Sequence, residues 1–309
     1  MISRADIEEA APRIHGYVRR TPIMPLEQYA WGINARLILK LEQFQYAGSF
    51  KPRGAFNRIL AHPVPDAGII AASGGNHGLA VAYAAQQLGY RAEIFVPELC
   101  PPIKVERLRH YGCEVKLVGA NYAEALAASE VQATQTGALV VHAYDQLEVV
   151  AGQGTLGREI AEQVPDLDTL LVAVGGGGLI GGIAAWFGRE VRVIGVEPER
   201  APTLYTSLKV GSPVDVEVGG IAADSLGARR AGSLAFEVAT HFIETVLLVG
   251  DEEIRDAQRR LWEDLRMVAE PGGATALAAV LSGRYHPEKG ERIGIVLCGA
   301  NVGLEQLMH

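Results

Sequence analysis

Short segments of continuous apolar residues alternate with helical patterns along most of this chain. A first group of strands is expected at 68–72, 92–96, 114–118 and 138–142. Helices expected at 76–89, 102–111 and 121–136 separate these strands. Strands that are apolar on both faces and separated by helices are typical of a parallel sheet that is covered on both sides. The alternation therefore predicts an α/β fold.

A second group of expected strands follows at 169–174, 191–196, 245–249 and 292–298, with helices expected at 150–163, 179–188, 251–267 and 273–282. The early apolar run 36–41 is expected to join this second sheet, which would place the first group inside the second. We therefore predict two three-layer α/β domains with mainly parallel, twisted sheets. The larger domain would comprise 1–53 plus 146–309, and the smaller, inserted domain would comprise 54–145. The segment 198–233 is expected to be a long irregular loop with a functional role.

Size and charge exclude several classes of protein. A chain of 309 residues has room for about two domains. The net charge of −8, with no offsetting basic cluster, argues against a nucleic-acid partner. No apolar run is long enough to span a bilayer, and the charged N-terminus lacks the apolar core of a signal peptide. Three cysteines give no disulfide framework, so a cytoplasmic, reduced setting is expected.

A lysine stands in an unusual setting in the segment Ser49-Phe50-Lys51-Pro52-Arg53-Gly54-Ala55. The amine of a lysine becomes a nucleophile that can form an imine when a dry pocket keeps it neutral. Most lysines are solvated surface charges, so Lys51 gains meaning only together with other motifs.

Four glycines, Gly175, Gly176, Gly177 and Gly178, come directly after the expected strand 169–174 and before Leu179. Backbone without Cβ atoms can wrap closely around an anion, and N–H groups at a helix start attract negative charge. The pattern predicts a phosphate site, because a tight turn by itself needs only one or two glycines.

The same glycines also fit a dinucleotide fingerprint. Gly176, Gly178 and Gly181 have its spacing, and Glu197 ends the next expected strand, where an acid that binds ribose would lie. An NAD-dependent oxidoreductase is therefore an alternative hypothesis. A lone fingerprint is a weak signal, and it leaves the segment around Lys51 unexplained.

The segment Ser73-Gly74-Gly75-Asn76-His77-Gly78 opens the helix that follows the expected strand 68–72. Hydroxyl, amide and free N–H groups at a helix start can bind a carboxylate. Capping by Ser73 or Asn76 would explain one such residue but not the glycine pair. His77 remains open between a packed or capping histidine and a catalytic one.

The last motif, Leu297-Cys298-Gly299-Ala300-Asn301, ends the final expected strand, and α/β proteins place ligands at such ends. Most free cysteines are small buried apolar residues, so Cys298 alone proves nothing.

Together, the motifs SFKPRGA, SGGNHG, GGGGL, AEPGGA and LCGAN, in this order and over nearly the whole chain, resemble the fold-type II enzymes that use pyridoxal 5′-phosphate. The resemblance is strongest to threonine/serine dehydratases and serine racemases, and it implies a tryptophan synthase β-like fold. The larger domain would then bind the cofactor, and the smaller domain would close over the substrate.

The resemblance also implies roles for residues of this chain. Lys51 would carry the cofactor as an imine and remove the Cα proton, with Phe50 beside it. Asn76 and Glu270 would contact the cofactor ring, and Cys298 would face its pyridine nitrogen. The cofactor phosphate would bind to Gly175, Gly176, Gly177, Gly178 and Leu179, and the substrate to Ser73, Gly74, Gly75, Asn76 and His77.

The implied reaction is β-elimination of L-threonine or L-serine to a 2-oxo acid and ammonia, with serine racemisation or other β-hydroxy amino acid chemistry as alternatives. Gly74 stands where serine racemases have a serine that acts as acid and base, which weighs against racemisation. Thr203 replaces one acid of a metal site that would include Glu197, so no tightly bound metal is predicted. Ser225 and Ala300 stand where relatives have glycine, and they leave the substrate specificity open.

The resemblance further implies a homodimer or homotetramer. The chain ends shortly after LCGAN, so a regulatory domain after this motif is not expected.

Overall fold

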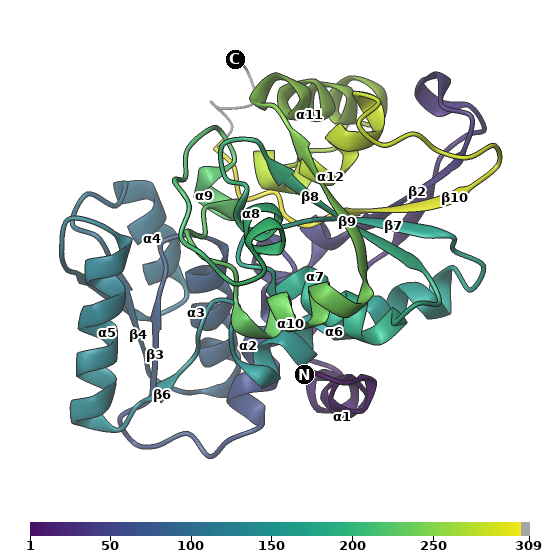
Figure 1. Ribbon diagram of the computed structural model, residues 1–309. Helices are drawn as coiled ribbons and strands as arrows, with labels where there is room; N and C mark the ends of the chain where they lie inside the picture. The colour runs from purple at the N-terminus through teal and green to yellow at the C-terminus, as the bar shows by residue number, and fades with distance from the viewer. Residues whose placement is uncertain (304–309) are drawn as a thin grey trace.

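The computed structural model describes residues 1–303 and contains two twisted sheets (Figure 1). The larger sheet has the order β1-β2-β10-β7-β8-β9, and the smaller has the order β5-β4-β3-β6. Every pairing is parallel except that of β1 with β2. The strands are β1 (Ile23–Pro25), β2 (Arg36–Leu41), β3 (Ile69–Ala72), β4 (Ala92–Val96), β5 (Glu114–Leu117), β6 (Leu139–Val140), β7 (Thr169–Ala173), β8 (Arg192–Pro198), β9 (Ile243–Val249) and β10 (Arg292–Leu297).

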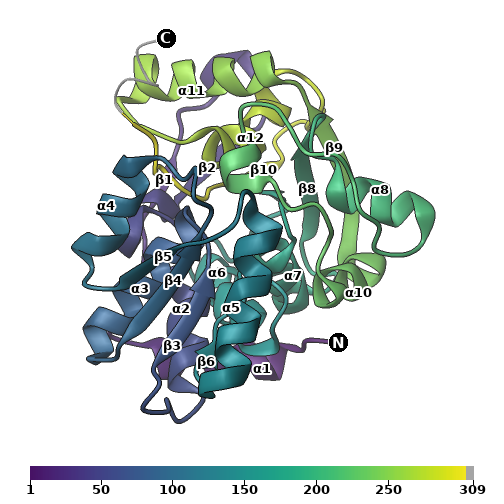
Figure 2. The same ribbon diagram turned by 90° about the vertical axis from the view of Figure 1, so that its left-hand side faces the viewer.

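Helices cover both faces of each sheet. They are α1 (Arg4–Ile14), α2 (Pro52–Leu60), α3 (Asn76–Leu88), α4 (Pro102–His110), α5 (Tyr122–Thr136), α6 (Leu147–Gln163), α7 (Gly178–Phe187), α8 (Thr203–Val210), α9 (Ala223–Leu226), α10 (Ser233–Phe242), α11 (Asp251–Leu265) and α12 (Pro271–Leu281). In the larger unit, α12 packs on one face with α11 outside it, and α7 packs on the other face with α6 and α10 outside it. In the smaller unit, α5 covers one face and α3 the other, and α2 packs against α3 (Figure 2).

The predicted α/β fold with parallel strands is confirmed, and β2 joins the larger sheet as expected. The prediction that 198–233 is irregular is wrong in part, because this segment contains α8 and α9. The start of α8 is stabilised from outside the helix: the carboxylate of Glu197, at the end of β8, accepts hydrogen bonds from the N–H groups of Leu204 and Tyr205. Helix α10 and the N-terminal elements α1 and β1 were not predicted.

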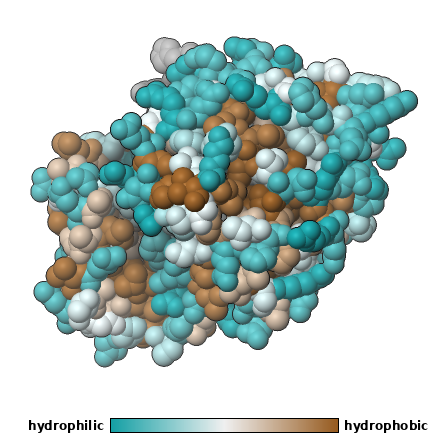
Figure 3. Space-filling view, viewed as in Figure 1, coloured by the Kyte–Doolittle hydropathy of each residue, from teal (hydrophilic) through white to brown (hydrophobic). Residues whose placement is uncertain are grey.

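Separate hydrophobic cores lie on the two sheets. The larger core surrounds β7, β8 and β10, and a second core lies between β3, β4 and the helices α2 and α3. A small third cluster lies between β3, β4 and α5. On the face shown in Figure 3, apolar side chains gather toward the middle, whereas hydrophilic side chains dominate the upper edge, where α11 lies. No helix within residues 1–303 is long and apolar enough to cross a bilayer.

Helix α6 packs so closely against α2 and α7 that their backbones are in contact. A Cβ atom on Gly152 would be 2.4 Å from the carbonyl oxygen of Arg53, at the start of α2. A Cβ atom on Gly154 would be 2.9 Å from the carbonyl oxygen of Gly182 in α7, and one on Gly182 would be 2.4 Å from that of Val150. Since α2 also packs on α3, the pair α6 and α2 connects the two sheets.

A buried cluster of charges anchors the start of α2. Arg53 is 1% exposed and forms ion pairs with Glu42 at 2.7 Å and with Glu159 at 3.0 Å. Glu159 also pairs with Lys40 at 2.5 Å. Burial opposes ionisation of Glu42, but the charge and hydrogen bonds of Arg53 hold the pKa of this carboxyl below its ordinary value. The cluster fixes the backbone directly after Lys51.

Candidate active site

Lys51 is the residue directly before α2, and it lies at the junction of the two sheets. Two contacts attach its segment to the end of β10: the N–H of Phe50 donates to the carbonyl oxygen of Cys298 at 3.1 Å, and Ser49 pairs with Gly299 in an isolated antiparallel bridge. Pro52 occupies the first turn of α2, where its missing N–H is not needed. The position of Lys51 is therefore set by a strand end on one side and by a helix start on the other.

The side chain of Lys51 is partly buried, and its amine has an unusual pKa. Its Nζ donates to the carbonyl oxygen of Ala143 at 2.7 Å and lies 5.2 Å from the ring centroid of Phe50. Burial lowers the pKa of Lys51 to about 8, against the opposing influence of Cys298 and Glu270. About a tenth of such an amine is neutral at pH 7, far more than for a solvated lysine. This is the condition that a nucleophilic lysine needs.

The four glycines form the glycine turn, Gly175–Gly178, between β7 and α7. Gly177 has a φ of +89°, which favours glycine, and a Cβ atom on Gly176 would lie 2.3 Å from the ring of Tyr144. The N–H groups of residues 175–177 have no acceptor within residues 1–303, and α7 starts here. Unpaired donors at a helix start form an anion site. Tyr144 follows Ala143, so consecutive residues contact the glycine turn and Lys51.

The start of α3 holds a chain of side-chain hydrogen bonds. Asn76 donates through Nδ2 to Oε1 of Glu270 at 2.5 Å, and Nδ2 of Asn301 donates to Oδ1 of Asn76 at 2.7 Å. Ser73 Oγ accepts from the N–H of Gly75 at 3.2 Å. Three segments that are distant in the sequence thus meet: the turn after β3, the start of α12 and the turn after β10.

His77 is a packed residue of this helix. Its Nε2 lies 2.9 Å from the carbonyl oxygen of Val141, and burial lowers the pKa of the imidazole to about 3. The ring is neutral at physiological pH and bonded to backbone. Of the two alternatives that the sequence left open for His77, this geometry supports the packed histidine.

Glu270 and Cys298 are buried close to Lys51, and both favour their neutral forms. Burial raises the pKa of Glu270 to about 7, although the hydrogen bond from Asn76 opposes the shift. Burial and the charge of Glu270 raise the pKa of the Cys298 thiol, and its Sγ donates to the carbonyl oxygen of Gly272 at 3.4 Å. A neutral thiol cannot hold a pyridine nitrogen fully protonated, so a ring placed beside it would be a moderate electron sink.

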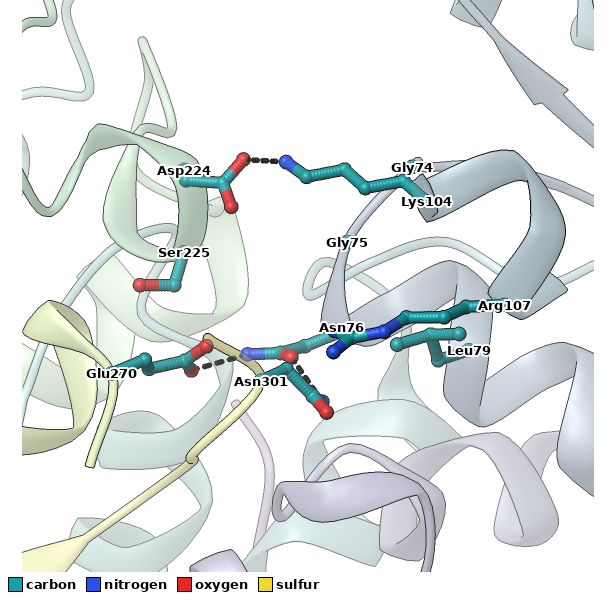
Figure 4. A pocket seen from close by; sticks show the side chains of 10 residues that line it. All are labelled: Gly74, Gly75, Asn76, Leu79, Lys104, Arg107, Asp224, Ser225, Glu270 and Asn301. Atoms are coloured by element: carbon teal, nitrogen blue, oxygen red, sulfur yellow. Dashed lines mark hydrogen bonds and ion pairs between the residues drawn. The ribbon is translucent and has the colours of Figure 1, made fainter. Parts of the chain in front are cut away.

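A pocket opens beside these residues, between the smaller unit and α9 (Figure 4). The predicted residues Gly74, Gly75, Asn76 and Glu270 line it, whereas Lys51, Cys298 and the glycine turn do not. Ser225, which the sequence placed near the pocket, also lines it. Further lining residues were not predicted as site residues: Leu79, Lys104, Arg107, Asp224 and Asn301.

Some of these additional residues had a signal in the sequence and others had none. Asn301 belongs to the motif LCGAN, and Asp224 precedes Ser225. Lys104 and Arg107 stand on α4, whose charged sequence is like that of any surface helix. Lys104 forms an ion pair with Asp224 across the pocket (Figure 4), so the two units touch there through opposite charges.

Glu197 and Thr203 lie apart from these residues and have structural contacts. The buried carboxylate of Glu197 caps α8, and burial raises its pKa to about 8. Thr203 Oγ1 donates to the carbonyl oxygen of Ala228 at 2.7 Å. Both carboxylate oxygens of Glu197 therefore bind the start of α8, so Glu197 is unsuited to bind a ribose. Over residues 1–303, no group of three His, Cys, Asp or Glu side chains is arranged to hold a metal ion.

Residues 14–299 match the family described as pyridoxal-phosphate dependent enzyme. The chain is 38% identical to an L-threonine ammonia-lyase of Thermotoga maritima, over 99% of this chain and 77% of that protein. Among solved structures it is similar to maize serine racemase, with a TM-score of 0.93, 35% identity and coverage of 99% of this chain and 96% of the other. It is also similar to a threonine deaminase from T.th., with a TM-score of 0.91, 35% identity and coverage of 98% and 99%.

Proposed function

Because the chain belongs to the pyridoxal-phosphate-dependent enzymes, we propose that it is an ammonia-lyase acting on L-threonine or L-serine, with a 2-oxo acid and ammonia as products. The observation that carries this proposal is the desolvated amine of Lys51, with its pKa of about 8, near the carbonyl oxygen of Ala143, the Cys298 thiol and the Glu270 carboxyl. The relatives named for threonine deamination support the choice of substrate.

The predicted family, its cofactor and its fold are confirmed by the family match and by the similar structures. The NAD-dependent alternative is wrong, and the contacts of Glu197 explain why its spacing misled: the carboxylate that would bind a ribose caps α8 instead. Close packing explains the glycine at position 181, since a Cβ atom there would lie 3.2 Å from Cα of Ala235.

The residues at the junction fit pyridoxal phosphate. The N–H groups of the glycine turn and of Leu179 would bind its phosphate, and Lys51 would form the covalent link. Phe50, Asn76, Glu270 and Cys298 would surround the ring. When bound, the cofactor supplies an electron-withdrawing ring that stabilises negative charge at the substrate Cα.

The protein's own groups would direct the reaction. The start of α3, with Ser73, Gly74, Gly75, Asn76 and its neighbour His77, would orient the substrate carboxylate through the helix dipole and the N–H groups of the first helical turn. The neutral amine of Lys51 would take the proton from Cα. The C–O bond at Cβ then breaks, water leaves, and the resulting enamine adds water to give the 2-oxo acid and ammonia. Gly74 offers no acid on the opposite face, which favours elimination over racemisation.

The first test is Lys51→Ala. The variant should lose the visible absorption of the bound cofactor, and its rate of 2-oxobutanoate formation from L-threonine should fall by about a thousandfold, because both the link and the base are removed. Lys116→Ala, which changes a partly exposed lysine of β5, is the matched control and should retain both properties. A Lys51→Ala protein with unchanged absorption would contradict the assignment.

Serine racemisation is the second candidate, because the chain is similar to maize serine racemase over 99% of its length. Proton NMR of L-serine in heavy water separates the two reactions. Exchange of the Cα proton without pyruvate would favour the racemase, and pyruvate formation would favour the lyase.

We also propose the finer organisation implied by the sequence. The larger domain would be residues 1–53 plus 146–309, and the inserted domain would be 54–145, in keeping with the placement of β3–β6 between β2 and β7 along the chain. The enzyme would be a cytoplasmic homodimer or homotetramer. Light scattering after gel filtration measures the oligomeric state.

A further inference from the structure

Helix α4 directs two cations at the pocket. Lys104 and Arg107 are three residues apart, so they stand on the same helix face, and both line the pocket opposite Ser225 and Glu270. Figure 4 shows the side chain of Lys104 reaching across to Asp224, whereas that of Arg107 extends toward the pocket interior.

The two cations differ in their partners. Lys104 has its counter-ion in Asp224. The guanidinium of Arg107 has no hydrogen-bond acceptor and no acidic partner in the part of the chain that the structure describes. The remaining carboxyl of the pocket, Glu270, already accepts a hydrogen bond from Asn76 and resists ionisation because it is buried. Arg107 is solvent-exposed and therefore presents to the pocket a positive charge that no carboxylate within residues 1–303 contacts.

The proposed lyase reaction does not use this charge for the substrate carboxylate. That group has its place at the start of α3, where Ser73 and Gly75 form the turn and the helix dipole favours an anion. L-threonine and L-serine carry no other anionic group. A second negative charge on the substrate side chain would complement Arg107, because a guanidinium binds a carboxylate or phosphate through two parallel hydrogen bonds.

We propose that Arg107 is a specificity-determining residue that selects substrates with an anionic group on the side chain, and that 3-hydroxyaspartate represents the preferred class. This inference rests on the proposed lyase function. With 3-hydroxyaspartate, Lys51 takes the Cα proton, the C–O bond at Cβ breaks with loss of water, and the enamine adds water to give a 2-oxo dicarboxylic acid and ammonia. With O-phosphoserine, phosphate leaves in place of water and the product is pyruvate.

The test compares kcat/KM of the cofactor-loaded enzyme for L-serine, L-threonine, L-threo-3-hydroxyaspartate and O-phospho-L-serine, measured by ammonia release. One of the two anionic substrates should exceed L-serine by at least about tenfold, and which one does so distinguishes a carboxylate from a phosphate. Arg107→Ala should lower the ratio of that substrate to L-serine by about ten- to a hundredfold, mainly through KM, because a charge-assisted contact is lost. Arg109→Ala, on the same helix and outside the pocket lining, should leave the ratio unchanged.

Two results would overturn this inference and leave the lyase function standing. The first is turnover of L-serine or L-threonine with no advantage for either anionic substrate. The second is an unchanged ratio of kcat/KM in Arg107→Ala. Absence of ammonia from all four substrates would overturn the lyase function. Calorimetric binding gives an answer that does not depend on turnover: L-aspartate should bind at least about tenfold more tightly than L-2-aminobutanoate, and Arg107→Ala should abolish the difference. Equal affinities would overturn the role of Arg107.

Discussion

Gly176→Ala should destabilise the protein through one neighbouring side chain. An added methyl group would lie 2.3, 2.4 and 2.6 Å from Cγ, Cδ1 and Cδ2 of Tyr144, which is closer than non-bonded carbon atoms approach. Gly176 has no positive φ, so alanine does not meet the penalty of a left-handed backbone there. The cost is therefore that of overpacking, about 1–3 kcal/mol in the free energy of unfolding.

A double-mutant cycle isolates this contact. Tyr144→Ala removes the three ring atoms, so adding Gly176→Ala to this variant should change the free energy of unfolding by less than about 0.5 kcal/mol, and the coupling energy should equal nearly the whole cost of the single change. Urea denaturation of the cofactor-free protein measures all four corners of the cycle. An equal loss in both backgrounds would refute the argument, since it would mean that the backbone, and not Tyr144, requires glycine.

The same cycle bears on the phosphate site. A methyl group forced against Tyr144 would displace the N–H groups of the glycine turn, so Gly176→Ala should weaken pyridoxal phosphate binding by at least about tenfold, and Tyr144→Ala should restore much of the loss. Titration followed by visible absorption measures the affinity. Unchanged affinity in the single variant would show that this turn does not bind the cofactor.

Two further changes test buried charges. Glu42→Gln should lower the free energy of unfolding by about 3–5 kcal/mol, because it leaves the buried cations Arg53 and Lys40 with Glu159 as their one remaining carboxylate. Glu8→Gln at an exposed helix pair should cost less than about 1 kcal/mol in the same urea experiment, and equal effects would contradict the reasoning. Glu270→Gln tests the pH dependence. In the folded protein the carboxyl of Glu270 keeps its proton up to a pKa of about 7, whereas an ordinary glutamate loses its proton near 4.5. Glu270 therefore lowers the free energy of unfolding of the cofactor-free protein by about 3 kcal/mol as the pH rises from about 4.5 to about 7. The wild-type minus variant difference in unfolding free energy should fall over this range, and a rise would refute the assignment.

The fold was predictable because its strands are buried on both faces. β7 and β8 read as continuous apolar runs, and such runs between helices leave few arrangements other than a covered parallel sheet. Helix α10, which was missed, depends on a partner outside its own segment, whereas α1 starts with a local capping box between Ser3 and Asp6. α10 is capped by the carboxylate of Asp145, which accepts from the N–H groups of Ser233 and Leu234 almost ninety positions away in the chain. A local pattern does not contain that information.

In the candidate site, too, some residues could be predicted from the local sequence and others depend on the folded structure. Lys51 and the glycine turn were predictable because unusual backbone demands, proline after lysine and four successive glycines, are visible in the sequence. Arg107 was not, because the feature that distinguishes it is the lack of a partner within the described part of the folded protein. The sequence also suggested a ligand role for Glu197 on spacing alone, and only the position of α8 shows that its carboxylate serves the backbone.

The contact between α6 and its neighbours limits how this enzyme can be altered. Gly152 and Gly182 lie so close to carbonyl oxygens of adjacent helices that even alanine has no room. A saturation mutagenesis experiment would therefore find positions along α6 as intolerant as those around Lys51, although they lie outside the pocket lining and would have no direct part in the chemistry. Efforts to redirect the enzyme to new amino acids should keep α6, α7 and the start of α2 as an unchanged block, and should place diversity on α4 and α9, whose side chains reach the pocket.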